Sequence, residues 1–193
     1  MNLLFMDNYD SFTYILRDYF LVKNCKVEVW RNDDINWRDN QRVQAYDGLV
    51  LSPGPGMPED AGFLIEVVNN QMGQMPMLGV CLGHQAIGLM LGGQLSRDRP
   101  WHGKQTTIYH QKHPLFNKMP SPTLVGRYHS WNVEGVDQYS IAKTKESTCM
   151  ALADDAKGVW GIQFHPESCM TIQGNQYISN FLRLAATFLN KGQ

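Results

Sequence analysis

Short apolar runs alternate with helical patterns along the first half of the chain. The runs predict strands at residues 3–6, 48–51 and 77–80, and an alternation of polar and apolar residues predicts another at 26–30. Between and after these strands, apolar side chains recur every three or four positions and predict helices at residues 12–20, 63–68 and 86–91. Asp10 or Ser11 is placed to cap the first of these helices. Strands that are separated by helices are typical of a parallel sheet with helices on both faces.

The second half of the chain has a different pattern. The helical period fades between residues 94 and 164, and strand-like runs replace it at Thr106–Tyr109, Thr123–Val125, Ser140–Thr144, Met150–Ala153 and Val159–Phe164. We expect these runs to form antiparallel hairpins that extend the sheet. An amphipathic helix from Tyr177 to Leu189 follows. The sequence therefore predicts an α/β fold in one domain, residues 1–193, with a mostly parallel central sheet and a small antiparallel addition.

Composition narrows the possible functions. The 193 residues are 43% hydrophobic and carry a net charge of −1, so the chain has no basic field for nucleic acid or for a membrane surface. No apolar run approaches the roughly 18 residues of a membrane-spanning helix. The N-terminus has no basic segment ahead of Asp7 and does not resemble a secretory signal. We therefore expect a cytoplasmic protein.

The cysteines give no sign of a metal or disulfide framework. Cys25, Cys81, Cys149 and Cys169 are scattered, and no C-x-x-C pair is present. No group of His, Asp or Glu has the spacing of a metal site either. We predict no metal and no cofactor, and we interpret Cys25, Cys149 and Cys169 as structural or incidental.

The segment Gly79-Val80-Cys81-Leu82-Gly83-His84-Gln85 has the most informative pattern. An apolar strand leads into it and a helix leads out. A cysteine between two glycines, G-x-C-x-G, has the form of a nucleophile elbow, the tight turn that presents a side chain at the end of a sheet. The dipole of the following helix favours the reactive thiolate. The alternative is a buried structural cysteine, but the surrounding motif favours a nucleophile. We expect His84 to pack near this turn and not to react.

A thiol nucleophile needs a base, and the segment 161–168 offers one. The predicted strand ends at His165, and Glu167 follows two residues later. A carboxylate beside an imidazole fixes its tautomer and stabilises its charged form. Because ends of neighbouring parallel strands meet at one edge of a sheet, His165 is expected near Cys81.

The loop Ser52-Pro53-Gly54-Pro55-Gly56 follows another predicted strand and is aimed at the same edge. A plain turn is the simplest interpretation. Its glycines also leave backbone N–H groups free to donate to a developing oxyanion. The amide of Leu82, next to the candidate nucleophile, is the natural second donor.

Together these segments resemble the class I glutamine amidotransferases, and more narrowly the amidotransferase subunits of anthranilate synthase and aminodeoxychorismate synthase. The similar segments run in order along nearly the whole chain, at residues 7–14, 52–56, 79–85, 102–104, 127–130 and 163–168. The combination is highly specific, although no single segment is. Two positions depart from the subfamily pattern, since Ile15 stands where asparagine is usual and Trp131 where leucine is usual.

The resemblance implies a role for individual residues. Cys81 matches the nucleophile, His165 the base and Glu167 the acid that orients it, while Gly56 and Leu82 match the oxyanion-hole amides. The glutamine-binding positions are matched by Gly54, Pro55, Gly56, Gln85, Ser130 and Trp131. The implied reaction is hydrolysis of L-glutamine through a γ-glutamyl thioester.

In this family the ammonia passes to a chorismate-using synthase component I, the implied protein partner. The product could be anthranilate, aminodeoxychorismate or both. More remote alternatives are a γ-glutamyl peptidase and a binding module without catalysis. An α/β-hydrolase is disfavoured, because in that family the acid precedes the histidine along the chain, whereas Glu167 follows His165.

Overall fold

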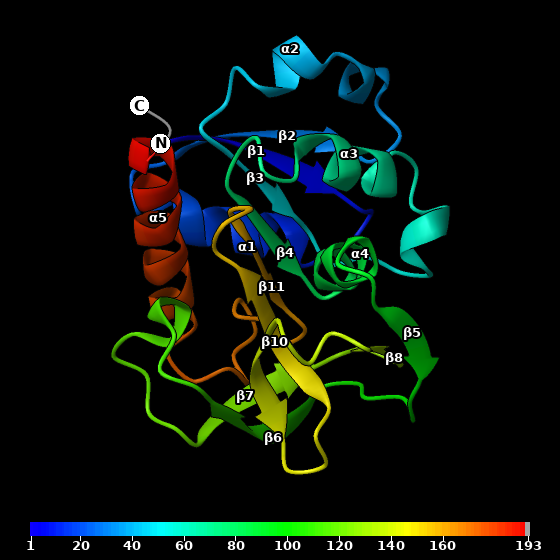
Figure 1. Ribbon diagram of the computed structural model, residues 1–193, viewed down its shortest axis with the longest axis vertical. Coiled ribbons are helices and arrows are strands. Elements are labelled where there is room, and N and C mark those ends of the chain that lie inside the picture. The colour runs from blue at the N-terminus through cyan, green and yellow to red at the C-terminus, as the bar shows by residue number, and fades with distance from the viewer. Residues whose placement is uncertain (192–193) are drawn as a thin grey trace.

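The computed structural model describes residues 1–191, and within them a nine-stranded sheet runs through the molecule (Figure 1). The strand order is β2-β1-β3-β4-β11-β10-β9-β6-β7. In chain order the sheet contains β1 (Asn2–Asp7), β2 (Lys26–Arg31), β3 (Gly48–Leu51), β4 (Met77–Val80), β6 (Lys104–His110), β7 (Thr123–Arg127), β9 (Ser140–Thr144), β10 (Cys149–Asp154) and β11 (Val159–Ile162). A separate antiparallel pair is formed by β5 (Gln94–Arg97) and β8 (Trp131–Glu134).

The sheet is parallel in one part and antiparallel in the other. Strand β1 pairs in parallel with β2 and β3, and β4 pairs in parallel with β3 and β11. Strands β10, β9, β6 and β7 then continue the sheet through antiparallel pairs. The predicted α/β class, with its antiparallel addition from the second half of the chain, is confirmed.

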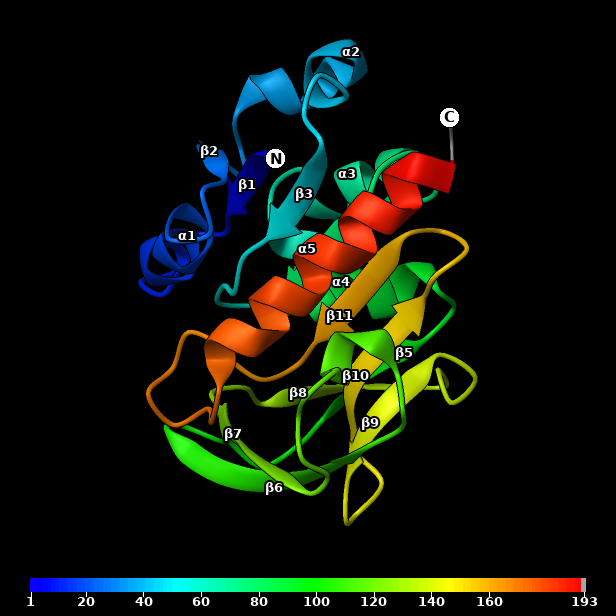
Figure 2. The same ribbon diagram turned by 90° about the vertical axis from the view of Figure 1, so that its left-hand side faces the viewer.

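Helices cover both faces of the parallel part. They are α1 (Thr13–Leu21), α2 (Asn40–Val43), α3 (Leu64–Gln71), α4 (Leu82–Met90) and α5 (Gly174–Lys191), with short 3₁₀ turns at Ile35–Arg38, Pro58–Asp60 and Pro114–Phe116. Because side chains alternate along a strand, Leu3 and Phe5 pack with α1 and α5, whereas Leu4 and Met6 pack with α3 and α4. Figure 2 shows α5 in front of the sheet and α4 behind it.

Two local predictions are corrected by the structure, and one pair of strands is new. The strand predicted to reach His165 ends at Ile162, so His165 lies on the loop beyond it. Helix α1 begins at Thr13 without a side-chain cap; the Asp10 carboxylate accepts instead from the N–H of Phe12, just before the helix. Strands β5 and β8 were not predicted, because β5 is polar and lacks a buried residue.

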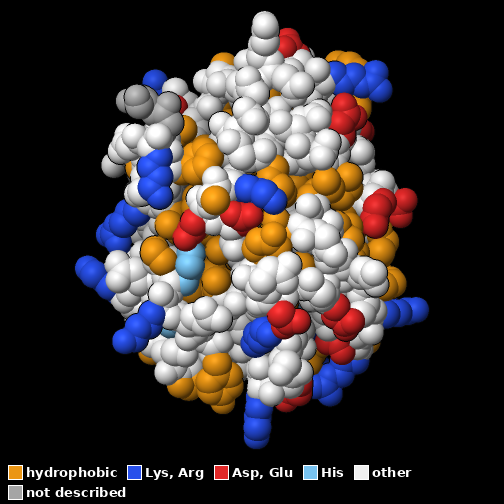
Figure 3. Space-filling model, viewed as in Figure 1, with side chains coloured by type: hydrophobic (Ala, Val, Ile, Leu, Met, Phe, Trp, Pro, Cys, Tyr) orange, Lys and Arg blue, Asp and Glu red, His pale blue; other side chains and the backbone are white. Residues whose placement is uncertain are grey.

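The surface agrees with the balanced composition. On the face shown in Figure 3, acidic and basic side chains are interspersed and do not gather into one patch. Among residues 1–191, no helix combines the length and apolar character that crossing a bilayer requires.

Candidate active site

Cys81 lies at the turn between β4 and α4 in a backbone conformation that L-residues rarely adopt, with φ of +51° and ψ of −99°. Its N–H donates to the Ile162 carbonyl of the neighbouring strand at 2.9 Å. Its carbonyl accepts from the N–H of Gln85 at 3.0 Å and so begins the helix. These contacts hold the strained residue in place, as is common for groups at functional sites.

The two glycines of the elbow are required by close packing. A Cβ at Gly79 would overlap the backbone of Gly83, and a Cβ at Gly83 would lie 2.5 Å from the carbonyl oxygen of Leu51. Both obstacles are backbone atoms, which cannot move as a side chain can. The glycines of the G-x-C-x-G pattern are therefore required because β4, α4 and β3 pack closely at this turn.

His165 and Glu167 form a buried pair beside this turn. The Nδ1 atom of His165 is 2.7 Å from Oε1 of Glu167, and both residues are almost completely buried. The rings of Phe12 and Tyr128 pack edge-on against the imidazole, with centroids 5.0 and 4.9 Å away. The His165 ring is therefore fixed on three sides, and its Nε2 atom has no hydrogen-bond partner among residues 1–191.

The charged form of His165 is favoured by its neighbours. Burial by itself lowers the pKa of His165, but the Cys81 thiol and the Glu167 carboxylate outweigh burial and raise that pKa to about 10. This direction is the one expected of an imidazolium that is paired with an anionic partner.

The Ser52–Gly56 loop is held against the β1–α1 connection. The N–H of Asn8 donates to Ser52 Oγ, and its side-chain amide donates to the Ser52 carbonyl, both at 2.9 Å. Gly54 fits so closely that a Cβ there would lie 2.5 Å from the Cβ of Asn8. Gly56 has a φ of +77° with open space in front of it. The loop is thus fixed at its base and leaves backbone free at its tip.

These elements enclose a pocket of about 240 Å³ at the carboxyl ends of the parallel strands. Its lining consists of Gly54, Pro55, Gly56, Cys81, Gln85, His102, Tyr128, His129, Ser130 and Trp131. The volume is below the roughly 300–1,000 Å³ of sites for drug-sized ligands. The pocket therefore suits a small molecule, and it brings together Cys81 and all the predicted substrate-binding residues.

Two residues of the site, Gln163 and Tyr128, were not assigned a role from the sequence. Gln163 is fully buried, and its Nε2 atom lies 3.7 Å from the Cys81 sulfur as a donor. Its Oε1 atom accepts from Gln85 at 3.4 Å. Tyr128 and His102 line the pocket. The signal for Gln163 was its position just beyond an apolar strand and close to His165.

The remaining cysteines differ from Cys81 in their surroundings. Cys25 and Cys149 are buried, and burial raises the pKa of both thiols. Cys169 is exposed. In the part of the chain that the structure describes, no three His, Cys, Asp or Glu side chains are grouped so as to hold a metal ion.

We expect the folded protein to lose stability in mild acid because of the buried histidine His84. The ring is fully buried against Gly161, and burial lowers the pKa of His84 to about 4. In the unfolded chain His84 has the ordinary histidine pKa of about 6.5, so below that pH it takes up a proton that the folded protein does not take up. The stability that comes from keeping His84 neutral is therefore fully present above about pH 6.5, and it is lost as the pH falls toward 4.

The measurement is urea unfolding between about pH 7.5 and about pH 4.5. We expect the His84 contribution to the free energy of unfolding to fall by on the order of 2 kcal/mol over this range. The loss should shrink in His84→Leu and persist in His102→Gln, whose histidine is exposed. Burial and Arg127 also keep His129 neutral, so His129 adds an acid loss of the same sign in the wild type and in both variants. An identical acid loss in His84→Leu would contradict this assignment.

Comparison with known proteins identifies the class of enzyme. Residues 4–185 match the model of class-I glutamine amidotransferases. The anthranilate synthase component 2, pyocyanine specific, of Pseudomonas aeruginosa is 42% identical over 94% of this chain and 93% of its own. The aminodeoxychorismate synthase component 2 of Serratia marcescens is 39% identical over 93% of this chain and 98% of its own. The chain therefore belongs to the class-I glutamine amidotransferase family.

Two further comparisons extend this result. The bifunctional protein TrpGD of Thermotoga maritima is also 39% identical, over 93% of this chain, which spans 31% of the length of that protein. A solved glutamine amidotransferase structure from Thermotoga maritima shares the fold, with a TM-score of 0.69 and 16% identity over all of this chain and 85% of that one. The predicted resemblance to the component 2 subunits, and the prediction of a glutamine amidotransferase, are confirmed.

Proposed function

We propose that this chain is the glutaminase subunit of a chorismate-using synthase, with Cys81, His165 and Glu167 as its catalytic triad. The observation that carries the proposal is the position of Cys81, strained at the strand–helix turn and lining a small pocket. The buried His165–Glu167 pair supports it by supplying a base whose charged form is favoured. The reaction uses groups of the protein and water alone, and we place it in the cytoplasm, where thiols stay reduced.

The first half-reaction forms a thioester. The Cys81 thiolate attacks the side-chain carbonyl carbon of glutamine, and a C–S bond forms as the carbonyl becomes an oxyanion. Backbone N–H groups of Gly56 and Leu82 are proposed to stabilise that oxyanion. The C–N bond then breaks, and the departing nitrogen takes a proton from His165, so that ammonia leaves.

The second half-reaction regenerates the enzyme. A water molecule attacks the thioester carbonyl and gives a proton to His165. The C–S bond breaks, which releases glutamate and restores the Cys81 thiolate. Glu167 accepts a hydrogen bond from His165 Nδ1 throughout and orients the ring without taking its proton. The sum is glutamine plus water giving glutamate plus ammonia.

The rest of the pocket is assigned to recognition of the amino-acid end of glutamine. We place the α-amino and α-carboxylate groups against Gln85 and the backbone of Ser130 and Trp131, with Gly54 and Pro55 forming the adjacent wall. All five residues line the pocket that contains Cys81. The side chain of the substrate would then point toward the sulfur.

The partner is proposed to be a component I subunit that adds the ammonia to chorismate. Both anthranilate synthase and aminodeoxychorismate synthase relatives bear the name component 2. We place the docking edge at residues 7–11, 54–56 and 102–104. Gly54–Gly56 and His102 line the same pocket, so a partner docked there would contact the walls of the glutamine site. Small movements of these loops would complete or spoil the oxyanion hole.

The product assay that tests this proposal uses the complex captured from the source cell. We expect glutamine-dependent formation of anthranilate or aminodeoxychorismate, and slower glutamate release from the chain alone than from the complex under saturating chorismate. Lys104→Glu, at the proposed edge, should weaken the complex while Cys81 remains open to alkylation. No glutamate release with any captured partner would refute the function. Equal rates with and without the partner would refute only the activation.

A further inference from the structure

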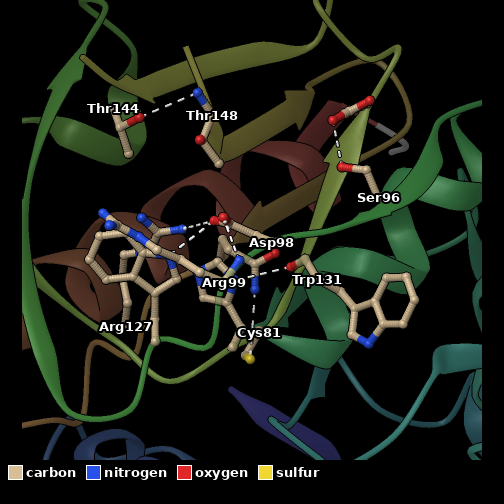
Figure 4. Close-up of polar contacts among 12 residues, drawn as sticks. Cys81, Ser96, Asp98, Arg99, Arg127, Trp131, Thr144 and Thr148 are labelled. Atoms are coloured by element: carbon tan, nitrogen blue, oxygen red, sulfur yellow. Dashed lines mark hydrogen bonds and ion pairs between the residues drawn. The ribbon is translucent and has the colours of Figure 1, made fainter. Parts of the chain in front are cut away.

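Arg127, at the end of β7, is a charged residue that is only 2% exposed. Its Nε atom donates to His129 Nε2 at 3.0 Å, and its Nη2 atom donates to Asp98 at 3.3 Å. The guanidinium carbon lies 3.9 Å from the centroid of the Trp101 ring. Figure 4 shows this cluster beside Cys81, with Asp98 and Arg127 joined by a dashed line. Packing alone does not explain this buried charge, because an apolar side chain of similar size often stabilises a core equally well or better. The directed contacts of Arg127 therefore indicate a further role.

The contact with Arg127 fixes the tautomer of His129. An arginine N–H can only donate, so His129 Nε2 must carry a lone pair and the hydrogen must lie on Nδ1. Nδ1 is 3.0 Å from the carbonyl oxygen of Trp131 and donates to it. Burial and the Arg127 charge lower the pKa of His129 to about 3, with smaller effects of the same sign from His84 and His165. The ring is therefore neutral, with one donor and one acceptor, both used.

The Trp131 carbonyl receives a second hydrogen bond from Gln85 Nε2, at 3.1 Å. A carbonyl oxygen has two lone pairs, so these two donors use both. The preceding backbone is also held, because the Ser130 carbonyl accepts from Asp98 N–H at 2.8 Å and the His129 carbonyl accepts from Trp101 N–H at 3.0 Å. In Figure 4 the indole of Trp131 points away from the cluster, while its backbone faces it.

We propose that Arg127 is a positioning residue for the glutamine site, which acts through His129 to fix the peptide of Ser130 and Trp131. This inference rests on the proposed function, because it is that function which places the α-groups of glutamine on this peptide. Arg127 itself does not line the pocket. Its effect reaches the substrate along a short path, from Nε to the His129 ring and from the ring to the Trp131 carbonyl. The same guanidinium ties the path to Asp98, on the segment that leads to His102.

The test compares Arg127→Met with Arg42→Met, which removes an exposed arginine on α2, a helix that contributes no residue to the pocket. In the complex, Arg127→Met should raise the KM for glutamine about tenfold or more and change kcat less than threefold. Ammonia-dependent synthesis should be unchanged. Arg42→Met should match the wild type in all three. A KM within twofold of the wild type would overturn the inference. A wild-type complex with no glutaminase activity would instead overturn the proposed function.

Alkylation of Cys81 separates positioning from general disruption. A diazoketone analogue of glutamine needs its α-groups recognised, whereas iodoacetamide does not. Arg127→Met should slow labelling by the analogue about tenfold and leave labelling by iodoacetamide within twofold. Equal slowing of both reagents would mean that the substitution merely disturbs the fold around Cys81, and would contradict a positioning role.

If Arg127→Met does not fold, substitutions at His129 test the same path. His129→Asn can keep a donor at the place of Nδ1, next to the Trp131 carbonyl, whereas His129→Gln reaches the place of Nε2 and loses that donor. We expect a raised KM mainly in His129→Gln. In the wild type, ¹⁵N imidazole shifts should report His129 with its proton on Nδ1. A proton on Nε2, or equal KM values in the two variants, would refute the path.

Discussion

Cys81→Ser should lose glutamine-dependent product formation by at least about 10³-fold, while the assembled complex still uses added ammonia. A serine hydroxyl is far less acidic than a thiol, so the pairing with His165 that favours an anionic nucleophile is lost. The substitution removes no packing, because the two side chains have similar size and the strained turn is fixed by backbone contacts. The synthase reaction downstream of ammonia is untouched.

The matched control for this experiment is Cys169→Ser, which replaces an exposed cysteine in the same way. Its glutamine-dependent rate should equal that of the wild type. Both variants should bind the partner, which gel filtration of the complex would verify. Glutamine-dependent synthesis by Cys81→Ser at more than a few per cent of the wild-type rate would remove Cys81 from the nucleophile position.

His165→Ala should lower the glutaminase rate by about 10³–10⁴-fold, and Glu167→Gln by about 10²-fold. The histidine moves protons in both half-reactions, whereas Glu167 orients it and stabilises its charged form through the 2.7 Å contact. A glutamine at 167 keeps an acceptor for Nδ1 but loses the charge. Steady-state glutamate release from the complex is the measurement. Equal losses in two well-folded variants would assign Glu167 a more direct role.

The pH profile of Glu167→Gln gives an independent check. Burial lowers the pKa of His165, and the contacts with Cys81 and Glu167 raise it to about 10. Without the Glu167 charge this pKa falls, so the proton needed by the leaving nitrogen is lost at lower pH. The alkaline limb of the rate profile should therefore move to lower pH in Glu167→Gln. An unchanged limb would show that Glu167 does not set the charge state of His165.

The sequence could predict the fold class because β1, β3 and β4 are compact apolar runs, each followed by a segment with helical spacing of its apolar residues. It could also predict that Cys81 and His165 lie at one edge, since both follow apolar strands. The order of the strands explains this proximity, because β11 joins the parallel sheet directly beside β4. That neighbour relation depends on pairing between residues 82 positions apart, such as Met77 and Val159, which no local pattern reports.

The sequence indicates that His129 fixes the Ser130 loop, but it could not predict the buried arginine behind this glutamine-binding segment. Arg127 stands in a run that would place a charged residue at the surface, yet it is buried against Trp101 and His129. Strand β8 alternates apolar and polar residues from Trp131 to Glu134, but over only four residues, and its partner β5 is mostly polar with no buried residue, so the pattern does not mark the pair as strands. Tertiary contacts, and not local preference, fix this part of the site.

The two departures from the subfamily pattern have different consequences in the structure. Ile15 is 45% exposed on α1, so the substitution there leaves the core unchanged and alters only the surface. Trp131 contributes its backbone to the polar cluster while its indole points away from it (Figure 4). The larger side chain is therefore compatible with the role proposed for its peptide.

Labelling with a diazoketone analogue of glutamine tests the central claim, that Cys81 is the nucleophile, most directly. Peptide mapping by mass spectrometry should find one label per chain, on Cys81, and excess glutamine should slow its formation. Glutamine-dependent synthesis should fall in proportion to labelling, while ammonia-dependent synthesis persists. Modification of Cys25, Cys149 or Cys169 with Cys81 intact, or labelling of Cys81 that glutamine does not slow, would contradict the account.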